Sequence, residues 1–406
     1  MISLQEARSH VLDTVARLDA VVRPRAEVLG CVTASDLVAQ EFIPPFHNTA
    51  MDGFAVQAAD TVDATESAPR KLKVVDTLAA GANPRREVRA GEAIRIMTGA
   101  PMPPGADAVI MVELTETVAG GDTVMVHAQV PEGNHVRAAG DDLKPGDPVF
   151  HRGAVLTPGH LGVIASVGAT GVEVYPRARV GVMSTGDELI DGPEPLGPGQ
   201  IRDANRHTLL ALLEQANAEP VDLGLIRDDE DAIAAALEHG AESCDAVLTS
   251  GGVSMGDFDY VKAVLSRIGE MRWMQIAIKP AKPMAFGTIG STPIFGLPGN
   301  PVSSMVSFEL FARPALLKMM GHTSLDRPTV QAIADEDLRR GPDGKVHFAR
   351  VLASYGEDGR YHIRFSGGQG SHQLAAMANG NALAIVSDGE GIEAGGTVQV
   401  MLLGPT

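Results

Sequence analysis

Strands and helices alternate along the middle of the chain, and this alternation constrains the fold more than any other feature. Strand patterns are predicted at 180–183, 221–226 and 246–248, and helical patterns at 207–215, 230–239, 257–267 and 302–317. This order is typical of a parallel, doubly wound sheet. Ligands bind at the carboxyl ends of the strands in such sheets. The turns that follow the strands are therefore the first candidates for a functional site.

The segments on both sides of this region predict further domains. At 406 residues the chain is longer than a single hydrophobic core usually supports. The box Ser3-Leu-Gln-Glu6 opens a predicted N-terminal helix. Short β patterns separated by glycine and proline turns occupy 43–147 and return after Leu325, and a connective stretch at 148–177 contains one short predicted helix. The expected fold class is a multidomain α/β protein with additional β-rich domains.

Composition excludes several classes of function. The 51 acidic residues outnumber the 33 basic ones, and the net charge of −18 disfavours binding to nucleic acid or to an anionic membrane. The 2 cysteines and 12 histidines form no zinc motif. The sequence has no signal-peptide layout and no apolar run long enough to span a bilayer, so we expect a cytoplasmic protein.

A glycine turn, TSGGVSMGDFD at 249–259, follows a predicted strand and precedes a helix. Glycines let backbone N–H groups approach an anion at a helix start. Asp257 and Asp259 would repel a bare phosphate, and a magnesium ion between the carboxylates and the phosphate removes this conflict. The turn therefore predicts a magnesium-assisted phosphate site. Two alternatives stay open: the carboxylates serve only the helix start, or Ser254 is the nucleophile of a GxSxG hydrolase motif.

A second strand end carries further carboxylates. The segment STGDE at 184–188 places hydroxyl groups, a glycine, Asp187 and Glu188 after a predicted strand. Helix capping is the simpler explanation for these two carboxylates. At adjacent strand ends, however, they would join Asp257 and Asp259 in an oxygen-rich pocket suited to a hard cation such as Mg²⁺.

Basic residues supply a candidate site for a second anion. Lys279 and Lys282 each precede proline, and in a polyproline II helix they would share one face, where a dianion relieves their repulsion. Asn300 fits an N-cap and Pro301 the first position of the next helix, which would present N–H groups to an anion. Arg350 and a glycine-rich hydroxyl loop add to this set from the last β domain.

Several of these segments jointly resemble the molybdopterin molybdenumtransferase family, which includes bacterial MoeA and the E domain of gephyrin. They occur in the family's order: PPFHNTAMDGFA, IMTGAPMP, STGDEL, TSGGVSMGDFDY, KPAKP, GLPGNPVS and GGQGSH. The resemblance extends from about Ile43 to the C-terminus. It implies a helix/linker domain (1–45 with 142–177), an inserted β-rich domain (46–141), an α/β molybdopterin-binding domain (178–326) and a small C-terminal β-barrel (327–406).

The resemblance also implies the reaction and the assembly. Molybdate is inserted into adenylated molybdopterin in the presence of Mg²⁺, which gives molybdenum cofactor and AMP. The active site is shared across a homodimer, with the second domain of one chain facing the third domain of the other. Molybdopterin adenylyltransferase and the recipient molybdoenzymes are candidate protein partners. No nucleic acid or membrane partner is expected.

Carried onto this sequence, the resemblance assigns the following site residues. The catalytic residues are Asp52, Asp142, Glu188 and Asp259. The magnesium ligands are Glu188, Asp257 and Asp259. The substrate-binding residues are Thr98, Asp228, Ser250, Gly251, Gly252, Lys279, Lys282, Pro298, Pro301, Arg350 and Ser371, of which Lys279, Lys282, Arg350 and Ser371 fall on the molybdate side. Two functional alternatives stay open: insertion of tungstate, whose charge and shape match those of molybdate, and a non-catalytic relative that binds the cofactor or acts as a scaffold.

Overall fold

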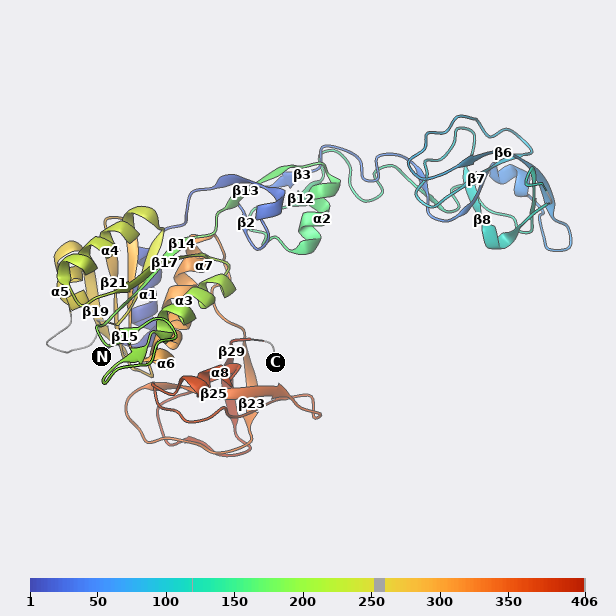
Figure 1. Ribbon diagram of the computed structural model, residues 1–406. Coiled ribbons are helices and arrows are strands. Elements are labelled where there is room, and N and C mark those ends of the chain that lie inside the picture. The colour runs from blue at the N-terminus through green and yellow to red at the C-terminus, as the bar shows by residue number, and fades with distance from the viewer. Residues whose placement is uncertain (119, 252–259, 405–406) are drawn as a thin grey trace. The chain divides into compact units, whose positions relative to one another are not determined.

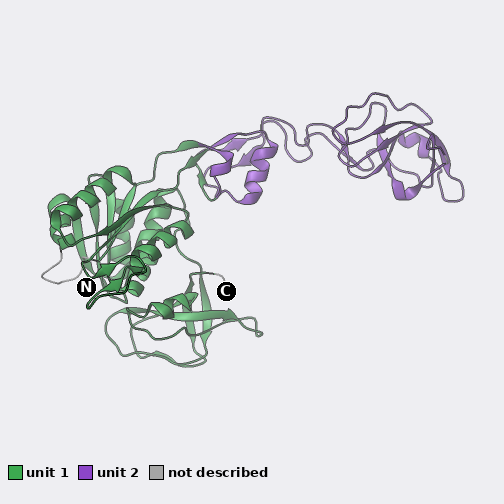
Figure 2. Cartoon of the chain, in the orientation of Figure 1, with its two compact units in different colours: residues 1–22, 30–34, 173–406 green, residues 23–29, 35–172 purple. Residues whose placement is uncertain are grey.

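The computed structural model describes residues 1–118, 120–251 and 260–404. The chain forms two compact units (Figure 2): unit 1 comprises residues 1–22, 30–34 and 173–406, and unit 2 comprises residues 23–29 and 35–172. The boundaries of the four expected domains stay a prediction. Among the described helices, none combines the length and apolar character that crossing a membrane requires.

Unit 1 contains the sheet that the alternating pattern predicts (Figure 1). Its strand order is β17-β14-β18-β22-β21-β19. The first four strands are parallel to one another, and β21 runs antiparallel to both of its neighbours, β22 and β19. The bounds are β14 (Arg179–Thr185), β17 (Glu219–Ile226), β18 (Ala246–Ser250), β19 (Glu270–Gln275), β21 (Pro283–Ile289) and β22 (Thr292–Leu297). The prediction of a mostly parallel sheet is confirmed.

Helices cover both faces of this sheet, as a doubly wound fold requires. One face packs against α1 (Leu4–Thr14), α3 (Ala204–Gln215), α6 (Pro301–Ser307) and α7 (Arg313–Met319). The other packs against α4 (Glu230–Ser243) and α5 (Tyr260–Ile268). Side chains of β14 alternate between the two cores, so that Val182 belongs to the first and Met183 to the second.

The helix expected at 302–317 is interrupted. A π-helical segment, η4 (Phe308–Ala312), lies between α6 and α7. Pro314 stands in the first turn of α7, and a proline there has no N–H for the i−4 carbonyl and collides with it in a regular helix. The wider π turn accommodates Pro314, and the helical segment continues from α6 through η4 to α7.

The C-terminal part of unit 1 is a closed barrel of five strands, β25-β26-β23-β29-β27, closed by pairing of β27 with β25. The bounds are β23 (Thr329–Ala334), β25 (Val346–Tyr355), β26 (Tyr361–Phe365), β27 (Ala382–Val386) and β29 (Thr397–Leu402). The short β20 (Ile278–Lys279) adds to the edge of β25 in parallel. A segment that precedes β21 of the α/β sheet is thereby held against the barrel. Smaller elements are β24 (Leu338–Arg339), β28 (Gly391–Ile392) and α8 (Leu374–Ala378).

Unit 2 contains the expected inserted β segment, a sheet of order β8-β5-β7-β6-β10-β9. The bounds are β5 (Gly53–Val56), β6 (Arg70–Leu78), β7 (Glu92–Ile96), β8 (Ala108–Met111), β9 (Thr115–Thr117) and β10 (Thr123–Val126). Apolar side chains form one core on each side of this sheet. The short helix expected near residue 158 is α2 (Pro158–Ser166). Two-stranded pairs complete the unit: β3 (Leu37–Val38) with β12 (Pro148–Phe150), and β4 (Asn48–Thr49) with β11 (Val136–Arg137).

Candidate functional site

Three parallel strands of unit 1 end side by side, and the turns after them form the first part of the candidate site. Ser184 of β14 is in register with Ser250 of β18, which is in register with Leu297 of β22. Ser250 is only 3% exposed although it ends its strand. The expectation that these strands end at one edge of the sheet is confirmed.

Two glycines shape this edge. Gly186 has φ +145, and a Cβ there would lie 2.5 Å from Oε2 of Glu188, so the glycine lets that carboxylate fold back over the end of β14. Gly251 has φ +96 and donates its N–H to the Leu297 carbonyl oxygen at 3.1 Å. Gly251, which follows β18, is thus held against the end of β22.

Carboxylates gather at the same edge. The N–H of Asp228 donates to Oδ1 of Asp187 at 3.3 Å. Burial raises the pKa of Asp228, and the nearby charges of Asp187 and Glu188 raise it further. A strand, β15 (Leu189–Ile190), follows Glu188, so neither Asp187 nor Glu188 caps a helix. Neighbouring carboxylates of this kind suit a hard cation, whose charge offsets their repulsion.

Asp257 and Asp259 of the expected magnesium site lie outside the described residues. So do Gly252 of the expected phosphate site and Ser254, the nucleophile of the hydrolase alternative. Within the described residues alone, no three side chains of His, Cys, Asp or Glu converge to form a metal site. The carboxylates of Asp187, Glu188 and Asp228 therefore fit Mg²⁺ by their chemistry and do not complete a site by themselves.

The loop after β22 brings distant segments together. Pro298 is buried, Asn300 occupies the N-cap position of α6 and Pro301 its first turn, as the sequence predicts. The Asn300 side chain, however, makes no capping hydrogen bond. The Ser371 carbonyl oxygen instead lies near the helix start, where it accepts the N–H of Val302 at 3.1 Å. Pro301 and Ser371 thus lie close to each other.

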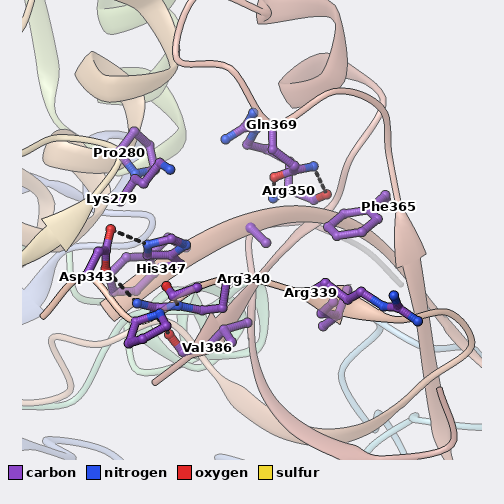
Figure 3. A pocket seen from close by; sticks show the side chains of 15 residues that line it. Lys279, Pro280, Arg339, Arg340, Asp343, His347, Arg350, Phe365, Gln369 and Val386 are labelled. Carbon is purple, nitrogen blue, oxygen red and sulfur yellow. Dashed lines mark hydrogen bonds and ion pairs between the residues drawn. The ribbon is translucent and has the colours of Figure 1, made fainter. Parts of the chain in front are cut away.

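A cavity of ≈ 400 Å³ lies where the Lys279-Pro280 segment meets the barrel (Figure 3). Its charged lining is mainly cationic: Lys279, Arg339, Arg340 and Arg350 face one carboxylate, Asp343. The lining contrasts with the net charge of −18 for the whole chain. The structure therefore brings together Lys279 and Arg350, two of the residues expected on the molybdate side.

Arg350 is the unusual member of this lining. It is 1% exposed, and its Nη2 donates to the carbonyl oxygens of Gly368 at 2.9 Å and Gly370 at 3.1 Å. Its buried Nε has no hydrogen-bond partner, and no carboxylate in the described part of the chain pairs with its charge. Burial lowers the pKa of this guanidinium. A buried, uncompensated cation is costly unless an anion binds to it.

Arg340, in the same lining, shows the opposite arrangement. Its side chain is also buried, but its Nη2 contacts Oδ1 of Asp343 at 2.6 Å and Oδ1 of Asp388 at 2.7 Å. Asp343 also contacts His347, and its pKa is lowered to about 2, chiefly by the hydrogen bond with that imidazole. The charge of Arg340 is thus compensated within the protein, whereas that of Arg350 is available to a ligand.

The expected polyproline II arrangement of Lys279 and Lys282 is wrong. Ala281 between them has φ +72, which lies outside the polyproline II region. The N–H of Ile276 donates to the Lys282 carbonyl oxygen at 2.8 Å, which closes the segment into a turn between β19 and β21. Lys279 consequently lines the cavity, whereas Lys282 is exposed and does not. A binding role for Lys282 stays a prediction.

In unit 2, strand register brings Asp52 and Thr98 together. Gly53 of β5 pairs with Ile96 of β7, so the residues just beyond this pair become neighbours. Oδ1 of Asp52 accepts hydrogen bonds from the N–H of Thr98 at 2.7 Å and from its Oγ1 at 2.8 Å. These bonds lower the pKa of Asp52, the backbone bond most strongly. Asp142 lines a separate cavity of ≈ 370 Å³, formed by residues 138–147, which contains neither Asp52 nor Thr98.

Replacing Thr98 with valine is expected to raise the pKa of Asp52 towards its ordinary value. The variant removes the hydroxyl bond to the charged carboxylate and keeps the backbone bond, so only part of the depression should be lost. An NMR titration of the carboxyl carbon measures this pKa, and Asp52→Asn assigns the signal. Asp36, whose pKa is lowered by the N–H of Arg152, is the internal control. An unchanged Asp52 pKa would show that the hydroxyl bond contributes nothing.

The structure adds residues that the sequence analysis missed. Asn205, in the first turn of α3, hydrogen-bonds to both Ser250 and Gly299. One sequence signal was present: Asp203 is an N-cap residue, which starts the helix earlier than the predicted 207. Arg340 and its carboxylate partners gave no such signal, because their contacts depend on how the barrel closes.

Comparison with known proteins places the whole chain in one family. Residues 2–168 match the MoeA N-terminal region (domain I and II), residues 181–318 a probable molybdopterin binding domain, and residues 331–403 the MoeA C-terminal region (domain IV). The chain is 37% identical over 404 residues to the molybdopterin molybdenumtransferase of Haemophilus influenzae, with 98% of each chain covered. It is 37% identical over 414 residues to molybdopterin molybdenumtransferase 2 of Mycobacterium tuberculosis, with 98% of this chain and 99% of that one covered.

Solved structures agree with this assignment. The crystal structure of the molybdopterin biosynthesis MoeA protein from Pyrococcus horikoshii OT3 matches with a TM-score of 0.78 and 32% identity, over 99% of this chain and 100% of that one. A second crystal structure of the Pyrococcus horikoshii protein gives a TM-score of 0.80 at 29% identity, with both chains fully covered. Because relatives above 30% identity extend over nearly the entire chain, this protein belongs to the molybdopterin molybdenumtransferases, a family of transferases in molybdenum cofactor biosynthesis.

Proposed function

We propose that this transferase inserts molybdate into adenylated molybdopterin and releases molybdenum cofactor and AMP. The observation that carries the proposal is the guanidinium of Arg350, which is buried, lacks a carboxylate partner among the described residues and lines a cavity with Lys279. An oxyanion supplies the charge that this site lacks. The relatives named as molybdopterin molybdenumtransferases make molybdate the leading candidate.

At the molybdate end, two cations would act differently. Lys279 offers a compact charge that suits a tetrahedral dianion from any direction. Arg350 offers directional donors, and its buried Nε lacks a hydrogen-bond partner in the described structure. The Gly368 and Gly370 carbonyl oxygens hold the guanidinium in place before the ligand arrives. Ser371 follows directly in the same loop, and Lys282 would approach from the neighbouring turn.

At the nucleotide end, the turns after the parallel strands would hold the phosphates. Ser250, Gly251 and Gly252 would supply a hydroxyl and N–H groups, and Pro298 and Pro301 would shape the adjoining loop. Asp228 would contact the pterin nucleotide. When bound, Mg²⁺ would offset the repulsion between phosphates and carboxylates. Its proposed ligands are Glu188, Asp257 and Asp259.

The proposed assembly is a cytoplasmic homodimer with shared active sites. Asp52, Thr98 and Asp142 would approach the substrate from the second chain, and support for this comes from the family resemblance of the segments that carry them. Molybdopterin adenylyltransferase would supply the nucleotide substrate, and recipient molybdoenzymes would take up the product.

The proposed reaction is tested by the release of AMP from adenylated molybdopterin. Release should require both molybdate and Mg²⁺, because hydrolysis of the nucleotide is proposed to accompany insertion of the metal. Arg339→Gln is the matched control, since this cavity-lining arginine is exposed and pairs with Asp337, and it should retain the release. Release without molybdate would indicate a simple hydrolase. Release with tungstate and not with molybdate would reassign the metal.

A further inference from the structure

Asn205 connects two of the turns at the strand-end edge of unit 1. It stands in the first turn of α3, and its Nδ2 donates to Oγ of Ser250 at 2.8 Å and to the Gly299 carbonyl oxygen at 2.7 Å. Ser250 ends β18, and Gly299 follows β22. The two turns also approach each other directly, because a Cβ on Gly299 would lie 3.8 Å from the Gly251 Cα.

The direction of these hydrogen bonds follows from chemistry. A carbonyl oxygen only accepts, so the amide nitrogen of Asn205, and not its oxygen, must face Gly299. The same nitrogen then donates its second hydrogen to Ser250, whose oxygen accepts. Ser250 retains one hydroxyl hydrogen, and within the described residues Asn205 is the only hydrogen-bond partner of that hydroxyl. The Ser250 hydroxyl is therefore left to act as a donor.

The first turn of α3 is held firmly enough to orient Asn205. Asp203 is 4% exposed; it accepts the Arg206 N–H at 3.2 Å and the Ser184 hydroxyl at 3.0 Å. Arg206, also buried, contacts Asp203, Asp191 and Asp222. These carboxylates attach the helix start to β14, β17 and the segment after Glu188. Asn205 is thus presented from a rigid support, as a positioning group requires.

We propose that Asn205 is a positioning residue of the phosphate site: it holds the end of β18 against Gly299, which follows β22, and directs the Ser250 hydroxyl towards a phosphate-containing nucleotide. The inference rests on the proposed function, which places a nucleotide at this edge. It assigns Asn205 an indirect role, through Ser250. A buried hydroxyl whose oxygen already accepts a hydrogen bond has fewer orientations to lose when it donates to a phosphate oxygen, which favours binding.

The test is calorimetric binding of AMP, the proposed product, to the full-length protein. Asn205→Ala and Ser250→Ala should each weaken AMP binding by about tenfold, as expected for one oriented hydrogen bond to a charged group. The double variant should be no weaker than either single variant, because both remove the same interaction. Asn205→Asp, which is nearly isosteric, should bind AMP more weakly than Asn205→Ala, since its charge faces the phosphate. Molybdate affinity should be unchanged in all of them.

Asn381→Ala is the matched control. The side chain of that asparagine also hydrogen-bonds to backbone, namely the N–H and carbonyl oxygen of Ala353, but it lies in the barrel. Its loss should lower thermal stability without changing AMP affinity. In turnover, Asn205→Ala should raise KM for the nucleotide substrate and leave kcat nearly unchanged.

Three results would overturn the inference: wild-type AMP affinity in Asn205→Ala, additive losses in the double variant, or a loss of thermal stability in Asn205→Ala with AMP affinity retained. A wild-type protein that binds no AMP would instead refute the proposed nucleotide site, and the inference with it. The two failures are therefore distinguishable.

Discussion

Arg350→Gln is expected to weaken molybdate binding by about two orders of magnitude, because a charge-assisted hydrogen bond contributes roughly 1.5–3 kcal/mol and tenfold in affinity corresponds to about 1.4 kcal/mol. The free energy of unfolding should change by less than about 1 kcal/mol, since the variant loses two hydrogen bonds and also removes an uncompensated buried charge. Calorimetry with molybdate and urea unfolding of the ligand-free protein measure the two quantities.

Arg340→Gln is the matched control for this variant, since both arginines are buried in the lining of one cavity. Removing Arg340 leaves Asp343 and Asp388 without their partner, so its free energy of unfolding should fall by about 3 kcal/mol. The two variants thereby distinguish a cation that binds the ligand, Arg350, from a cation that stabilises the fold, Arg340. Normal molybdate affinity in Arg350→Gln, or a loss of stability as large as that of Arg340→Gln, would contradict an oxyanion site at Arg350.

Mixing Asp52→Ala chains with Arg350→Gln chains is expected to restore about a quarter of the wild-type activity, if two inactive homodimers exchange subunits freely. Half of the dimers are then mixed, and a symmetric pair of shared sites leaves one site complete in each of them. The two residues suit this test because Asp52 belongs to unit 2 and Arg350 to unit 1. Molybdate-dependent release of AMP measures the restored activity.

The control is either variant incubated alone, which should remain inactive. Two affinity tags, one on each variant, allow mixed dimers to be purified and verified before the assay. Verified mixed dimers without activity would indicate that each site is built within a single chain. A protein that is a stable monomer in solution would also contradict the shared site, because a shared site requires a dimer.

Much of the fold is readable from the sequence, because the patterns that determine it are local. The apolar runs at β14, β17 and β18 alternate with helical periodicities, and this order leads to a parallel sheet with helices on both faces. The same reasoning places the glycine turns at one edge, where Ser184 and Ser250 are in register. The prediction of local backbone conformation failed where the preference of a short segment competed with tertiary contacts. The turn between β19 and β21, which contains Ala281 at φ +72, is the clearest case.

The sequence by itself determined the α/β sheet and the family, since each depends on residue type and order. Only the tertiary structure decided which of the arginine charges in the cavity lining are already compensated by carboxylates. Arg340 and Arg350 are the same residue type in the sequence. Closure of the barrel brings Asp343 and Asp388 to Arg340, whereas Arg350 contacts the carbonyl oxygens of Gly368 and Gly370 and no carboxylate of the described residues. Likewise, Asn205 reaches Ser250 and Gly299 only because parallel strands far apart in sequence end side by side. Such contacts depend on register and closure, which local sequence patterns do not encode.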